Sequence, residues 1–250
     1  MNTPIVAVSL KMYFDRARTL EYCRSVAEIG HRSAAVADGQ VRLAVLPDHL
    51  TLAAAAELLQ GTRVMFGAQD LSQEDRGAFT GEVSGYDIAE LGARVVEVGH
   101  AERRTIYGES DEMVAAKTAA AVRNGLIPLL CIGEADRTDD TSIAAAVCAQ
   151  QVRSAVGTSG TPAEVWLAYE PYWAIGAPEP APVQYAREVC DALDDEVAAF
   201  LPNRSIVYGG SAGPGLFNQL YPSVDGVFLG RFAHDPAALA AVVDEAASLR

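Results

Sequence analysis

The stretch EVWLAYEPYWAIGAPEP (164–180) joins a strand-like run, a carboxylate and an apolar loop. The run EVWLAY (164–169) is largely apolar on both faces, which is typical of a strand buried in a parallel sheet. Glu170 ends this run, and the loop after it carries two aromatic residues and an isoleucine between prolines, with Gly176 as a flexible point. A carboxylate at the end of a buried strand, followed by such a loop, predicts a catalytic base beneath a lid.

Seven further β-rich runs alternate with alanine-rich amphipathic patterns, and capping residues mark several helix starts, among them Asp48, Ser110 and Asp235. Eight such units fill 250 residues, and no composition shift marks a linker. We therefore predict an α/β fold, a closed (β/α)8 barrel forming a single domain over 1–250. The main alternative is an open doubly wound sheet, but no GxGxxG follows the first strand. The predicted strands are 5–10, 41–46, 63–66, 94–98, 126–131, 164–169, 205–208 and 226–229.

The composition limits the partners of the protein. A net charge of −14 disfavours nucleic acid and anionic membranes. The apolar runs fall short of the roughly 18 residues that span a bilayer, and the N-terminus does not resemble a signal peptide, so we expect a cytoplasmic protein without a membrane partner. The four cysteines lack CxxC spacing and do not pair with the four histidines, which predicts reduced core thiols and no metal site.

Several polar residues stand where predicted strands end. Lys11 ends the first strand, His100 follows the fourth and Glu170 ends the sixth, while YGGS (208–211) and LGRF (229–232) follow the seventh and eighth. Each has an ordinary explanation when taken singly, such as a loop histidine or a glycine turn. A barrel, however, gathers the C-terminal ends of its strands on one rim, where enzymes of this fold place their active residues. Together these residues predict one active site.

Six segments resemble the triosephosphate isomerase family, in order and over nearly the whole chain. They are KM (11–12), GAFTGE (77–82), VEVGHAERR (96–104), LIPLLCIGE (126–134), AYEPYWAIG (168–176) and YGGS (208–211). The resemblance implies a barrel, usually dimeric, that interconverts dihydroxyacetone phosphate and D-glyceraldehyde 3-phosphate without a cofactor or metal.

Isomerising an α-hydroxy carbonyl needs a base that removes a C–H proton and a donor that stabilises the enediolate. The resemblance implies that Glu170 is the base and that His100, at a helix start, is a neutral electrophile, the pairing established for this family. Lys11 would supply a positive charge beside the developing oxyanion and the phosphate. Glu102 would take part in hydrogen bonding or proton transfer near Lys11.

The other roles concern the phosphate, the lid and the subunit contact. Backbone N–H groups near helix starts would hold the phosphate, those of Gly176, Ser211, Gly230 and Arg231. A lid would close over the enediol phosphate and exclude water; its residues are Pro171, Trp173, Ile175 and Gly176. The long connection 67–82 would enter a neighbouring subunit, where Thr80 would support the region around Lys11 of the partner subunit. We therefore expect a homodimer.

The chain departs from the family pattern at four places: Ser9 replaces Asn, Ala101 replaces Ser, Ala177-Pro178-Glu179 replaces Thr-Gly-Lys, and Gly230-Arg231 replaces a Gly-Gly pair. Ser9 frees space on one side of the pocket. The guanidinium of Arg231 either clamps the phosphate or leans outward. This pair resembles relatives that isomerise L-erythrulose 1-phosphate to D-erythrulose 4-phosphate. The triose reaction is the first expectation and the tetrulose reaction is the alternative.

Two readings from other classes compete with an isomerase. A Schiff-base aldolase would need a pocket lysine near the sixth strand, but Glu170 stands there and Lys117 lies on a helix. A non-catalytic sugar-phosphate-binding barrel would have lost the base or the electrophile, whereas Lys11, His100 and Glu170 are all present.

Overall fold

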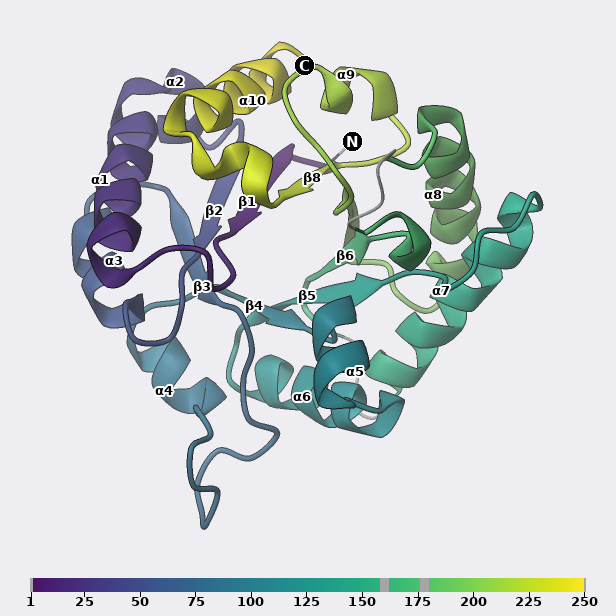
Figure 1. The fold of residues 1–250 in the computed structure, drawn as a ribbon, viewed down its shortest axis with the longest axis horizontal. Helices are drawn as coiled ribbons and strands as arrows, with labels where there is room; N and C mark the ends of the chain where they lie inside the picture. The colour runs from purple at the N-terminus through teal and green to yellow at the C-terminus, as the bar shows by residue number, and fades with distance from the viewer. Residues whose placement is uncertain (1, 158–161, 176–179, 250) are drawn as a thin grey trace.

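The computed structural model describes residues 2–157, 162–175 and 180–249. Eight parallel strands pair in chain order, and the last pairs with the first, so the sheet closes into a barrel (Figure 1). The predicted (β/α)8 barrel is confirmed. Its strands are β1 Ile5–Ser9, β2 Arg42–Leu46, β3 Met65–Ala68, β4 Val95–Val98, β5 Ile127–Ile132, β6 Val165–Tyr169, β7 Arg204–Tyr208 and β8 Gly226–Leu229.

The helices form a ring outside the strands (Figure 1). Within the described ranges, none of them is long and apolar enough to cross a membrane. The α-helices are α1 Arg16–Arg32, α2 Ala34–Ala37, α3 Leu52–Leu59, α4 Gly85–Glu90, α5 Ala101–Tyr107, α6 Asp111–Arg123, α7 Thr141–Val156, α8 Val183–Val197, α9 Leu216–Leu220 and α10 Pro236–Ser248, and two short 3-10 helices are η1 Tyr172–Ala174 and η2 Arg231–His234.

Two of the three predicted caps hold their helices. Ser110 Oγ accepts the N–H of Met113 at the start of α6, and the carboxylate of Asp235 accepts the N–H of Ala237 at the start of α10. Asp48 differs, because it accepts the N–H groups of Leu50 and Thr51 and so closes a turn. The third helix, α3, therefore begins at Leu52 rather than directly after Asp48.

The strands have two buried faces, as the apolar runs predict. In β1, Ile5 and Ala7 belong to the cluster that fills the barrel, whereas Val6 and Val8 belong to the larger cluster beneath the helices. Side chains alternate between the faces of a strand, so the next inward position of β1 is Ser9. All four cysteines are buried and free, in agreement with the prediction of reduced core thiols.

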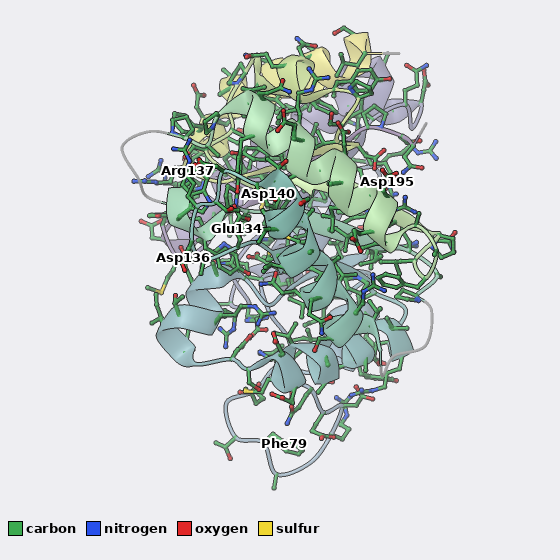
Figure 2. All side chains as sticks on the ribbon, turned by 90° about the vertical axis from the view of Figure 1, so that its right-hand side faces the viewer. Phe79, Glu134, Asp136, Arg137, Asp140 and Asp195 are labelled. Atoms are coloured by element: carbon green, nitrogen blue, oxygen red, sulfur yellow. The ribbon has the colours of Figure 1, made fainter. Side chains whose placement is uncertain are left out.

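The connection between β3 and α4 projects away from the barrel (Figure 1). Phe79 lies near its tip (Figure 2) and is 44% exposed, and the neighbouring Thr80 is exposed as well. The subunit contact predicted for this loop stays a prediction.

Candidate active site

A cavity of about 220 Å³ opens at the C-terminal rim of the barrel. It is lined by residues that follow β1, β4, β6, β7 and β8, as the strand-end pattern predicts. Gly176 and Ala177-Pro178-Glu179 lie outside the described residues. The predicted site residues that line the cavity are Lys11, His100, Glu102, Glu170, Pro171, Ile175, Ser211, Gly230 and Arg231.

Glu170 continues the inward face of β6 into this cavity, two positions after Ala168. Only 3% of the residue is exposed, and Oε2 has no hydrogen-bond partner among the described residues. Burial raises the pKa of Glu170 to about 8; Lys11 opposes this rise, and the carboxyls of Glu97 and Glu102 add to it. A carboxyl with a pKa near the working pH and a free oxygen suits a general base.

Two glycines make room for this carboxyl. A Cβ at Gly209 would lie 2.5 Å from Glu170 Cγ, and one at Gly133 would lie 1.8 Å from the Glu170 carbonyl oxygen. Any side chain at either position would displace the base.

His100 is the N-cap of α5. Its Nδ1 accepts the N–H of Glu102 at 3.1 Å, so the proton of the neutral ring resides on Nε2. Burial and then the charge of Lys11 lower the pKa of His100 to about 4, against the opposing effect of Glu102. Nε2 lies 3.3 Å from Glu170 Oε2. A neutral N–H donor therefore faces the same space as the base.

Lys11 brings a cation to this space. Its Nζ donates to Glu102 Oε1 at 2.8 Å. Burial alone would lower the pKa of Lys11, but this hydrogen bond and the charges of Glu170, Glu102 and Glu97 outweigh burial and raise it. Lys11 also has a φ of +48°, the one positive φ of a non-glycine residue in the described part of the chain. Such strain is typical of functional positions.

Gln69, which follows β3, holds the backbone of Lys11. Its Nε2 donates to the carbonyl oxygens of Lys11 and Leu46, both at 3.0 Å. The amide thus ties the ends of β1 and β2 together where the backbone is strained. This role cannot be inferred from the sequence, because it depends on a contact between residues 58 positions apart.

The lining of the cavity also includes Ser211, Gly230 and Arg231. Arg231 begins η2, and its guanidinium carbon lies 5.7 Å from the centroid of the Tyr13 ring. Because Lys11 has the one positive non-glycine φ described, the φ of Arg231 is negative and its N–H can face the cavity. These residues offer backbone amides and a cation, the groups that bind phosphate.

Trp173 lies at the start of the predicted lid. Its Nε1 donates to Glu134 Oε1 at 2.7 Å, and its ring packs edge-on against Tyr185 at 5.6 Å. Glu134, at the β5–α7 connection (Figure 2), also accepts the hydroxyls of Tyr169 and Tyr185. Trp173 therefore anchors the start of the loop and does not line the cavity, whereas Ile175 lines it and is 38% exposed.

The model of the family "Triosephosphate isomerase" matches residues 4–246, which is nearly the whole chain. The chain belongs to the triosephosphate isomerase family. It is 49% identical over 249 residues to L-erythrulose-1-phosphate isomerase of Pectobacterium atrosepticum, with 98% of this chain and 96% of that protein covered. It is 39% identical to triosephosphate isomerase of Symbiobacterium thermophilum, with 100% and 99% covered. The crystal structure of triosephosphate isomerase from Bartonella henselae matches with a TM-score of 0.84 and 26% identity over the full length of both chains.

Family membership makes this chain a cofactor-independent aldose-ketose isomerase and implies a sugar phosphate substrate. The structure shows where two of the departures from the family pattern lie. Ala101 is the buried first residue of α5. Ser9 lies beneath the cavity rather than in its lining, and its Oγ donates to Glu97 Oε2 at 3.1 Å.

Sequence reasoning assigned no role to Glu97. It stands in the quoted motif VEVGHAERR, and an acid inside an otherwise apolar strand was the available signal. Burial raises the pKa of Glu97 to about 8, opposed by Lys11 and the Ser9 hydrogen bond and assisted by Glu102 and Asp70.

Proposed function

We propose that this protein isomerises L-erythrulose 1-phosphate to D-erythrulose 4-phosphate. The observation that carries the proposal is the 49% identity over 98% of the chain to a relative of that name, against 39% to a triosephosphate isomerase covered equally well. The sequence alone put the triose reaction first, and this difference in identity reverses that order.

The site residues can supply every step. In L-erythrulose 1-phosphate the carbonyl is at C2 and the proton to be removed is on C3. The Glu170 carboxylate takes this proton; the C–H electrons form a C2=C3 double bond, and the carbonyl oxygen becomes an oxyanion. His100 Nε2–H donates to that oxygen, and the ammonium of Lys11 offsets its charge.

The reverse proton transfer completes the reaction. Glu170 returns its proton to C2, and the C3 hydroxyl loses a proton as its C–O bond becomes the new carbonyl. His100, in reach of both oxygens, relays the proton from the C3 oxygen to the C2 oxygen. No proton or electron is gained overall, and the product, numbered from its other end, is D-erythrulose 4-phosphate.

Cavity geometry supports the placement of the phosphate. Ser211, Gly230 and Arg231 line the same cavity as the reacting groups Glu170 and His100. We propose that their amides and the Arg231 guanidinium bind the phosphate dianion.

We also propose that the protein acts as a cytoplasmic homodimer. The β3–α4 loop projects with Phe79 exposed, and Met12 beside Lys11 is 93% exposed, so both surfaces are open to a second copy. Thr80 would then support Lys11 of the partner subunit. Size-exclusion chromatography with activity assays tests this, and a fully active monomer would refute it.

The substrate is tested by measuring kcat/KM for L-erythrulose 1-phosphate and for D-glyceraldehyde 3-phosphate on one preparation. We expect the tetrulose phosphate to be preferred by at least about tenfold, which corresponds to 1.4 kcal/mol of transition-state binding. A Glu170→Gln variant serves as the control, because both activities should fall together when the base is lost. A preference for the triose phosphate would overturn the proposal.

A further inference from the structure

Ser9 and Glu97 occupy the last inward positions of their strands. Ile5 and Ala7 of β1, and Val95 of β4, fill the barrel interior. Alternation along each strand places Ser9 and Glu97 on that same inward face, nearer the C-terminal rim. They form the top of the barrel interior and the floor beneath the cavity.

The fold uses only part of the hydrogen-bonding capacity of the Glu97 carboxyl. It is 4% exposed, and Ser9 Oγ is the one hydrogen-bond donor that its side chain meets within the described residues. Its second oxygen, Oε1, lies 3.9 Å from His100 Nε2, the nitrogen that faces the reacting space. Among the described residues Oε1 has no hydrogen-bond partner, and it lies beside the reacting space, so it is available to a ligand.

The proposed substrate carries a group that would need such a partner. A tetrulose phosphate differs from a triose phosphate by a hydroxymethyl group on the reacting carbon farther from the phosphate. With the reacting carbons between Glu170 and His100, a group on the carbon farther from the phosphate is within reach of Glu97, whose Oε1 lies 3.9 Å from His100 Nε2. Ser9, beside Glu97, is shorter than the Asn of the family pattern.

We propose that Ser9 and Glu97 form a subsite that binds the terminal hydroxymethyl group of a four-carbon ketose phosphate, an inference that rests on the proposed function. The free Glu97 oxygen forms a hydrogen bond with the substrate hydroxyl. A triose phosphate leaves this carboxyl without a partner. Sites built to bind a hydroxyl discriminate strongly against analogues that lack it, because their own buried polar groups then stay unpaired.

The test compares L-erythrulose 1-phosphate with its 4-deoxy analogue, in which the terminal CH2OH is CH3. The wild-type protein should prefer the hydroxylated substrate by about 10- to 100-fold in kcat/KM, the range expected for a hydrogen bond to a buried carboxyl. Glu97→Leu should reduce this preference to within about threefold, and Glu97→Gln, which keeps a polar group, should retain part of it. If Glu97→Leu fails to fold, the Gln variant carries the test.

Two further variants separate a subsite from a general structural role. Ser9→Asn refills the space and should lower kcat/KM for the tetrulose phosphate at least about tenfold more than for the triose phosphate. Glu164→Gln is the matched control: Glu164 also accepts hydrogen bonds while half-buried, but it precedes β6 at the opposite end of the barrel, so the preference should not change.

The outcomes distinguish the subsite from the proposed function. Activity on L-erythrulose 1-phosphate without preference over the 4-deoxy analogue would overturn the subsite alone. Equal losses on tetrulose and triose phosphates in the Glu97 and Ser9 variants would do the same and make Glu97 a general positioning residue. A protein active on the triose phosphate and inactive on the tetrulose phosphate would overturn both proposals.

Discussion

Replacing Glu97 by Gln should stabilise the protein at pH 8 relative to the wild type, and much less at pH 5. Glu97 is almost fully buried, and burial is the main reason that its pKa rises from 4.5 to about 8. Gln has nearly the same shape as the protonated acid but cannot ionise. The substitution therefore isolates what it costs the fold to keep a titrating group at this position.

The sign follows from the direction of the pKa change. A carboxyl whose folded pKa exceeds its unfolded value holds its proton more tightly in the folded state, so its contribution to stability is full below pH 4.5 and is lost as the pH rises toward 8. The difference of 8 − 4.5 corresponds to about 5 kcal/mol at 1.36 kcal/mol for each pKa unit. The difference in the free energy of unfolding between Glu97→Gln and the wild type should therefore increase by about 3 to 5 kcal/mol from pH 5 to pH 8, in favour of the variant.

Urea unfolding followed by circular dichroism, at fixed protein concentration and at pH 5, 6, 7 and 8, measures this difference. Glu164→Gln provides a control of opposite sign. Burial would raise the pKa of Glu164, but hydrogen bonds from Arg42 and Trp166 outweigh it and lower the pKa, so this carboxylate stabilises the fold above its unfolded pKa. A difference between Glu97→Gln and wild type that stays constant from pH 5 to pH 8 would refute the reasoning.

Three other predictions concern the site and its surroundings. The kcat/KM should rise with pH with an apparent pKa near 8, because Glu170 must be ionised to act as the base. His100, with a pKa of about 4, stays neutral over this range. A pH–rate profile that is already flat above pH 6 would contradict this. Arg231→Gly should raise KM for both substrates, by about 3- to 10-fold more for the tetrulose phosphate, and equal effects in steady-state assays would discard its specificity role. Lys117→Met should cost about 2 to 3 kcal/mol in urea unfolding, because Nζ lies 2.7 and 2.5 Å from the carboxylates of Asp70 and Glu109, which would keep only Arg103 as a cation; an unchanged midpoint would count against it.

The fold can be predicted because strands that are buried on both faces require continuous apolar runs in the sequence. Each strand is short and apolar on both faces, and all eight predicted strands occur, with ends within two residues of those predicted. The third strand shows what the pattern misses. The prediction stopped at Phe66, but β3 continues through Gly67, where a Cβ would lie 2.1 Å from the carbonyl oxygen of Val95. Glycine there permits close packing of strands, which sequence alone cannot distinguish from a turn.

The site was predictable only where residues stand at strand ends. The barrel topology alone brings Lys11, His100 and Glu170 to one rim. The roles of the supporting residues cannot be predicted in this way, because they depend on contacts between residues far apart in the sequence. Ser9 and Glu97 are 88 residues apart, and Glu134 and Trp173 are 39 residues apart. The lid role of Trp173 stays a prediction, to which this contact adds an anchor at the first hinge.

The two raised carboxyl pKa values also bear on how so acidic a protein binds a phosphate dianion. The chain has a net charge of −14, and three carboxyls surround Lys11. If all were ionised, the site would repel its substrate. Lys11 and Glu102 form an ion pair that is neutral as a unit, and pKa values of about 8 keep Glu97 and Glu170 largely protonated at pH 7. The substrate-free site is therefore close to neutral, which leaves Arg231 and the backbone amides to attract the phosphate. The proton that makes Glu170 a poor base at low pH thus removes a charge that would oppose binding.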